Sequence, residues 1–99
     1  MKKAPEFLDL LEEKDAEFTR HIKANLKNEH EDSALPAKIK LLMVMALDAA
    51  HGEHEGVKIV AERAREAGAT EEEILETVKL VGNTCGIQGL YVGMHALKK

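Results

Sequence analysis

A short stretch in the middle of the chain contains most of the residues that could do chemistry. The sequence HGEHEG, at positions 51–56, holds two imidazoles and two carboxyls. Imidazole exchanges protons near neutral pH and also binds metal ions. The stretch is therefore a candidate for acid–base catalysis or for metal binding. A third interpretation is a polar junction between two helices, in which the acids stabilise the start of the second helix.

The catalytic hypothesis rests on three of these residues. His54 has the properties of a general base, and Glu53 lies directly beside it in the sequence. The stretch supplies no nucleophile, so proton transfer is the chemistry that it favours. We predict catalytic roles for Glu53, His54 and His51, with a small molecule as the possible ligand and with no cofactor.

Metal binding needs more ligands than the stretch offers. His51 and His54 lie one helical turn apart if the backbone between them is helical, and a distant third candidate is His30. Strong zinc motifs supply three or four ligands at recognisable spacings. We therefore predict no metal site, and a weak metal-binding module that uses His51 and His54 stays as an alternative.

The chain has one cysteine, Cys85, in the sequence GNTCG. One cysteine excludes an internal disulfide and a CxxC redox pair. A lone cysteine is most often a small buried hydrophobe. The alternative is a reactive thiol near a helix start, with His51 or His54 as its partner in space.

Helical periodicity runs through the whole chain. Pro5 fits the first turn of a helix that carries an apolar stripe as far as Leu26 and frays at residues 28–32. Ser33 is the expected N-cap of a second helix, which runs from Ala34 to about Ala50.

The second helix contains the most apolar run of the sequence. Residues 41–47 are apolar on every face of a helix. A helix of this kind is buried all round, or it is buried partly by another subunit. The small size of the chain favours the second possibility.

The second half of the chain predicts three further helices. A junction at residues 51–53 precedes a third helix that runs to Ala67, and Gly68 is its expected stop. Thr70 and Glu73 form a predicted capping box at the start of a fourth helix. Residues 82–86 break the pattern, and a last helix follows with an apolar face formed by Ile87, Leu90, Tyr91 and Met94.

Composition limits the class of protein. The 99 residues predict one domain, residues 1–99, and only three of them are aromatic, so the core must be aliphatic. The net charge of −4, with both signs interspersed, argues against a nucleic-acid surface. The longest strongly apolar run is too short to span a bilayer, and no targeting segment is visible. We expect a soluble cytoplasmic protein without a membrane partner.

Two segments carry a resemblance to a known family. The sequence KIKLL opens a helix at residues 38–42, and AREAGATEEEI follows at residues 64–74 without a gap in the expected spacing. The stretch from Lys38 to about Leu90 resembles the carboxymuconolactone decarboxylase family, which includes the alkylhydroperoxidase D-like proteins. The resemblance implies an all-α, five-helix bundle of the alkylhydroperoxidase D-like type. It also implies a homo-oligomer, most simply a trimer or a hexamer.

The residues expected at the active site depart from that family. Redox-active members carry a glutamate directly after the second lysine, where this chain has Leu41. Their CxxC falls on Glu53 and Gly56, and their histidine, one helical turn further on, falls on Val60. The decarboxylase branch lacks the cysteines but keeps that histidine. The resemblance therefore implies the fold, and thiol peroxidase activity is not expected.

Three functional hypotheses stay open at this point. The first is a family member of unassigned activity that binds a small molecule, or catalyses a different reaction, around positions 51–54. The second is a non-catalytic oligomeric protein with a structural or interaction role. The third is the weak metal-binding module. The sequence alone does not decide whether the protein is an enzyme.

Overall fold

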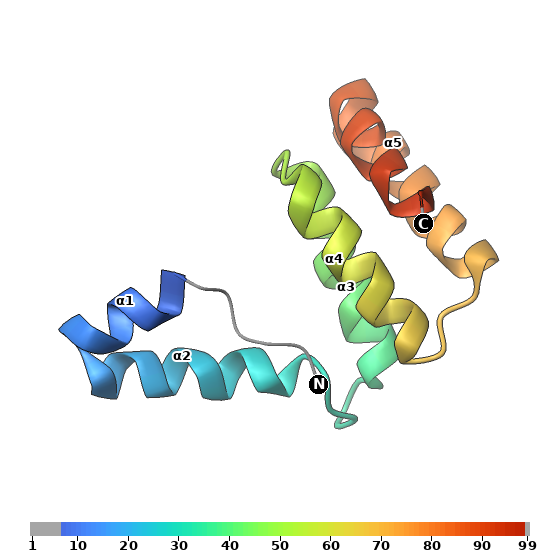
Figure 1. Cartoon of the computed structure of the whole chain (residues 1–99). Coiled ribbons are helices and arrows are strands. Elements are labelled where there is room, and N and C mark those ends of the chain that lie inside the picture. Colours follow the sequence, from blue (N-terminus) through green and yellow to red (C-terminus); the bar gives the residue numbers. More distant parts are fainter. Residues whose placement is uncertain (1–6, 99) are drawn as a thin grey trace.

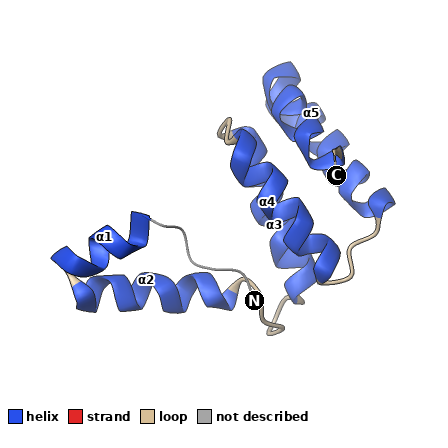
Figure 2. Cartoon of the chain, in the orientation of Figure 1, coloured by secondary structure: helices blue, strands red, loops and turns tan. Residues whose placement is uncertain are grey.

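The computed structural model describes residues 7–98. Five α-helices and one short 3-10 helix account for its regular structure, with no strand among the described residues (Figure 2). The all-α class predicted from the sequence is confirmed. Pro5, the expected first-turn residue of the first helix, lies outside the described residues. No described helix combines the length and the apolar character that crossing a membrane requires.

The N-terminal helices form an arm that stands away from the rest of the molecule (Figure 1). α1 (Phe7–Lys14) and α2 (Ala16–Asn28) are separated by Asp15, whereas the sequence predicted one continuous helix. That prediction was wrong because Asp15 caps a new helix. Its carboxylate accepts a hydrogen bond of 3.1 Å from the backbone N–H of Phe18, which satisfies a donor in the first turn of α2. We call α1 and α2 the N-terminal arm.

α3 (Ala37–Ala50) begins three residues later than predicted. The expected N-cap, Ser33, does not cap it, because the carboxylate of Asp32 accepts a hydrogen bond of 2.7 Å from the backbone N–H of Ala37. The Asp32 carboxylate also faces the positive end of the helix dipole. Its negative charge interacts with that end more favourably than a neutral hydroxyl would. The Ser33 hydroxyl instead accepts a bond of 2.7 Å from the Lys40 ammonium.

α3 is the central helix of a bundle that it forms with α4 (His54–Glu66) and α5 (Glu71–Gly93), and it contacts both (Figure 1). The core between the three helices is aliphatic, as the composition predicted. Its most buried members are Leu41, Met45 and Ala49 of α3, Val57, Ala61 and Ala64 of α4, and Ile74, Val78 and Val92 of α5. Alanine and valine dominate this set, so the helices can approach one another closely.

α4 ends in a Schellman turn at the predicted glycine. Gly68 has a φ of +104°, which favours glycine. The N–H of Ala69 donates to the carbonyl of Ala64 at 2.9 Å, and the N–H of Gly68 donates to the carbonyl of Arg65 at 3.0 Å. Both alanines are buried, so the turn encloses an apolar contact.

α5 begins with the predicted capping box. The Thr70 hydroxyl accepts a bond of 3.0 Å from the N–H of Glu73, and the Glu73 carboxylate accepts one of 2.9 Å from the N–H of Thr70. The Glu73 carboxylate also pairs with Lys38 of α3 at 3.0 Å. These bonds, first that from the Thr70 backbone and then that from Lys38, lower the pKa of Glu73. The capping box therefore also ties α5 to α3.

α5 reverses its direction at Gly86, where φ is +83°. Its two halves lie side by side: a Cβ on Gly93 would lie 3.3 Å from a methyl of Val78, and one on Gly82 would lie 3.3 Å from Leu90. The predicted break at residues 82–86 and the helix after it are thus confirmed. The short helix η1 (Met94–Leu97) continues this last segment.

We expect Thr70→Ala to lower the free energy of unfolding by about 1 kcal/mol, because the first turn of α5 loses its N-cap acceptor. Thr70→Ser keeps the hydroxyl and is the matched control. Urea unfolding followed by circular dichroism measures both variants. Equal stability of Thr70→Ala and Thr70→Ser would contradict the role given to the capping box.

Candidate active site

The HGEHEG stretch is the turn that reverses the chain between α3 and α4. Gly52 has a φ of +80°, and its N–H donates to the carbonyl of Ala49 at 3.2 Å. The N–H of Glu53 donates to the carbonyl of Asp48 at 2.9 Å. This is the hydrogen-bond pattern of a second Schellman turn. The predicted junction at residues 51–53 is confirmed, and α4 starts at His54.

The two Schellman turns of the chain enclose opposite kinds of side chain. Such turns usually place an apolar contact between the two residues that the longer hydrogen bond joins. At the end of α4 these residues are Ala64 and Ala69, both buried. At the end of α3 they are Asp48 and Glu53. The turn geometry therefore brings two carboxyls together at a place where the fold alone would favour two small apolar side chains.

The surroundings of Asp48 perturb its carboxyl. Its side chain is half-buried, and burial raises the pKa of its carboxyl above the ordinary value. The negative charge of Glu53 raises it further, while His51 acts in the opposite direction. A Cβ on Gly56 would lie only 2.7 Å from the Oδ2 atom of Asp48. Glycine at position 56 therefore leaves room for the carboxyl beside the first turn of α4.

His54 takes part in a cluster of three aromatic rings. Its imidazole lies 4.6 Å from the ring of His95 and 5.9 Å from the ring of Tyr91, edge to face in both cases. Tyr91 and His95 complete the triangle at 5.7 Å. The cluster joins the start of α4 to the last turn of α5 and to η1. The Nδ1 atom of His95 donates to the carbonyl of Val92 at 3.0 Å, so the neutral ring has its free lone pair on Nε2.

The acids and the rings flank the same helix end from two sides. His54 and Gly56 are two positions apart, which places them about 200° apart around a helix. His54 faces the rings of α5 and η1, and Gly56 faces Asp48 of α3. The N-terminus of α4, with its unpaired N–H groups and positive dipole end, lies between the two.

The three predicted catalytic residues follow one another in the turn but have different surroundings. The exposed His51 ring turns back along α3, where its Nδ1 donates to the carbonyl of Leu47 at 2.8 Å. Glu53 is exposed at the N-cap position of α4, makes no side-chain cap bond and lies beside Asp48. Of the three, His54 is the one whose ring lies against other rings, those of Tyr91 and His95.

The sequence interpretation missed three residues of this arrangement: Asp48, Tyr91 and His95. Asp48 carried a local signal, since it is a lone acid directly after an apolar run and near the negative end of a helix. Tyr91 and His95 are one helical turn apart. Nothing local relates them to His54, because the contact depends on how α4 packs against the end of the chain.

The described residues contain no group of three or more His, Cys, Asp or Glu side chains placed to hold a metal ion. His30, the distant third ligand considered from the sequence, lies in the connection between α2 and α3. Cys85 is exposed, and its sulfur lies 3.5 Å from the Thr84 hydroxyl and not against a histidine. Neither the metal-binding alternative nor the thiol alternative gains support from this geometry.

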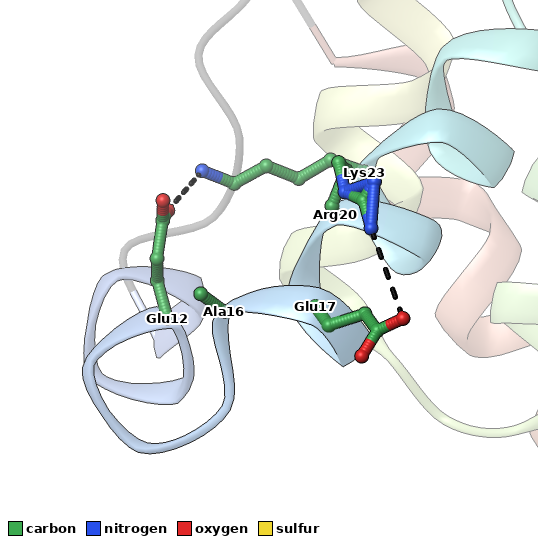
Figure 3. A pocket seen from close by; sticks show the side chains of 5 residues that line it. All are labelled: Glu12, Ala16, Glu17, Arg20 and Lys23. Atoms are coloured by element: carbon green, nitrogen blue, oxygen red, sulfur yellow. Dashed lines mark hydrogen bonds and ion pairs between the residues drawn. The ribbon is translucent and has the colours of Figure 1, made fainter.

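The N-terminal arm carries a separate polar hollow between α1 and α2 (Figure 3). It is lined by Glu12, Ala16, Glu17, Arg20 and Lys23. Lys23 pairs with Glu12 at 2.8 Å, and Arg20 lies 4.0 Å from Glu17. Each cation there already has an anion, and the site lacks a residue with catalytic chemistry. We therefore place the candidate active site at the α3–α4 turn.

The comparison with protein families agrees with the all-α fold. The model of the carboxymuconolactone decarboxylase family matches residues 16–99, which is most of the chain. No curated protein and no solved structure matches the sequence. The family match confirms the resemblance seen in the sequence.

We expect Asp48→Asn to stabilise the protein near neutral pH. A raised pKa means that the folded state holds the proton more tightly than the unfolded chain, so ionisation of Asp48 destabilises the fold as the pH rises above the ordinary value of 3.8. The gain from the substitution should therefore shrink as the pH drops toward 3.8, and it should be absent below that value. Urea unfolding across the acid range measures it, with Asp9→Asn on the exposed face of α1 as the control. A gain independent of pH would contradict the assignment.

Proposed function

Because this chain belongs to the carboxymuconolactone decarboxylase family, we propose that it acts on a small organic acid by proton transfer at the N-terminus of α4, without thiol chemistry. The observation that carries this proposal is the pair formed by Asp48 and Glu53, in a type of turn that usually encloses an apolar contact. Groups that cost stability and are nevertheless held in place are typical of functional sites.

The acid pair supports the role of a proton donor. Burial and the charge of Glu53 let Asp48 keep its proton to higher pH, while Glu53 is exposed to solvent. Two carboxyls with different surroundings can thus take different roles, one as the acid and the other as a fixed negative charge. Gly56 keeps the space beside the Asp48 carboxyl open.

The cluster of His54, Tyr91 and His95 could supply a base. It lies on the side of the α4 N-terminus opposite to Asp48. His95 has its Nε2 lone pair free in the neutral ring, and His54 lies against it. A carboxylate group seated over the first turn of α4 would meet unpaired N–H groups and the positive end of the dipole. The acid and the base then lie on either side of one bound molecule.

The reaction class that fits is proton transfer next to a carbonyl or carboxyl group. An imidazole takes a proton from the carbon beside the carbonyl, and the electron pair of the broken C–H bond moves to the carbonyl oxygen as an enolate. The Asp48 carboxyl then donates its proton to a carbon of this enolate, which re-forms the carbonyl and gives the product. The imidazolium gives its proton to solvent, and Asp48 takes up a proton from solvent. Val60 stands where the decarboxylase branch is expected to keep a histidine, so we assign the proton-transfer class and not the decarboxylase reaction itself.

A binding screen tests the proposal directly. Carboxymuconolactone and a set of small lactone acids and dicarboxylic acids serve as probes, and thermal unfolding measures binding. We expect at least one probe to raise the melting temperature of the wild type. This shift should be lost in His54→Gln and reduced at least several-fold in Asp48→Asn, although the latter is the more stable protein. His21→Gln, on the exposed side of α2, should keep the full shift. A shift retained in both site variants would rule the site out.

The absence of thiol chemistry is tested separately. We expect peroxide reduction by the wild type to equal that of Cys85→Ser, because the cysteine is exposed and lacks a resolving thiol. A peroxidase assay with a dithiol as the reductant measures both proteins. Turnover that depends on Cys85 would overturn the proposal, whereas binding of the acid probes by Cys85→Ser would support it.

A further inference from the structure

The guanidinium of Arg65 connects α4 to the start of α5 and to η1. Arg65 lies in the last turn of α4, and its side chain is only 12% exposed. Its Nε and Nη2 atoms donate to the two carboxylate oxygens of Glu71, at 2.6 and 3.0 Å. Nη2 also donates to the backbone carbonyl of Ala96 in η1, at 2.8 Å. We call these three hydrogen bonds the Arg65 clamp.

The Arg65 clamp compensates for the weak internal bonding of η1. A 3-10 helix of four residues has few backbone hydrogen bonds, and their geometry is poorer than in an α-helix. The side chain of Ala96 is fully buried, and its carbonyl is the acceptor in the clamp. A guanidinium that binds a carboxylate through two parallel bonds is fixed in orientation. The clamp therefore holds this part of η1 in one position against α4.

His95 is the residue of η1 whose ring this arrangement orients. It directly precedes Ala96, and its half-buried ring donates from Nδ1 to the carbonyl of Val92 at 3.0 Å. A carbonyl oxygen only accepts, so the neutral ring has its proton on Nδ1 and its lone pair on Nε2. The clamp holds the backbone after His95, and the ring is bonded to the backbone before it. The Nε2 lone pair consequently has a fixed direction.

The other two histidines of the site are held less firmly or lie elsewhere. Within residues 7–98, no group gives the exposed ring of His54 a hydrogen bond. His51 donates from Nδ1 to the carbonyl of Leu47 at 2.8 Å, but its exposed ring turns back along α3. A general base must be held within reach of the proton that it removes. Of the three imidazoles, that of His95 meets this requirement best.

We propose, on the basis of the proton-transfer function proposed above, that His95 is the base and that Arg65 is the residue that positions it. The Nε2 atom of His95 takes the proton from the carbon beside the carbonyl, and the electron pair of the C–H bond moves to the carbonyl oxygen. The imidazolium keeps its Nδ1–H bond to Val92, so the ring does not turn during this step. His54, whose ring lies 4.6 Å away, contributes to binding of the acid.

Nitrogen-15 NMR of the imidazole side chains tests the clamp without a substrate. At alkaline pH the wild type should show His95 as the Nδ1–H tautomer. Arg65→Lys keeps the charge but loses the paired bonds, and Glu71→Gln weakens them with less risk to folding. Both variants should move the His95 signals toward an average of the two tautomers.

Two controls belong to this measurement. The His51 signals should not move, because this ring makes the same kind of bond without the clamp. Arg20→Lys, on the exposed surface of α2, should leave all signals unchanged. A wild-type His95 in the Nε2–H tautomer would overturn the proposal. His95 signals that respond to neither clamp variant would overturn the role given to Arg65.

Deuterium exchange tests the base. Levulinate, a small acid with C–H bonds beside a carbonyl group, serves as the probe in D2O together with each acid that raises the melting temperature. His95→Gln should lower the maximal rate of exchange about 100-fold and leave KM within about twofold of the wild type. Arg65→Lys should lower the maximal rate several-fold at unchanged KM. His54→Gln should mainly raise KM, and His21→Gln should match the wild type.

The outcomes distinguish this inference from the proposed function. Normal maximal exchange in His95→Gln would leave the function standing and overturn the assignment of the base. Loss of the maximal rate in His54→Gln alone would overturn it as well, because His54 would then be the base. A wild type that exchanges none of the probes would overturn the proton-transfer function, and the base role with it. The NMR result would still decide whether Arg65 positions His95.

Discussion

The turn at Gly52 is the constraint on which the arrangement of the site depends. A left-handed residue there ends α3 and returns the chain as α4 within three residues, and the hydrogen bond from Glu53 to Asp48 closes the turn. That bond sets the two carboxyls side by side, and it aims the first residue of α4 toward the end of α5. A residue with a Cβ at position 52 would be strained at this φ. The site is thus a consequence of how one helix stops.

The close packing of the bundle also shapes the site. Gly93 lies where α3 and both halves of α5 meet, and a Cβ there would lie 3.6 Å from Ala49 and 3.3 Å from Val78. Small residues at this crossing let the last segment of the chain lie close to α3. The same segment carries Tyr91 and His95 to the start of α4. Packing far from any chemistry therefore decides which rings surround His54.

The helix starts and stops that could be predicted are those whose signals lie close together in the sequence. Thr70 with Glu73, and Gly68 before them, are stop and start signals whose hydrogen bonds lie within a few residues, so they were found without knowledge of the fold. The break at Asp15 had the same kind of signal, an aspartate three residues before an apolar position, but the apolar stripe that continues across it hid the break. Asp32 replaced Ser33 as the cap of α3 because a carboxylate can reach over a longer connection. The ring cluster could not be predicted, since it joins residues about 40 positions apart.

α3 connects these features, since one side of it builds the core, its end forms the turn, and its outer side is free. Asp48 belongs to the same helix as Leu41 and Met45, which the core buries, so the packing of α3 against α4 and α5 also sets where this carboxyl lies. The acid pair therefore depends on the fold in two ways: the turn at Gly52 returns Glu53 to Asp48, and the core holds the helix that carries Asp48.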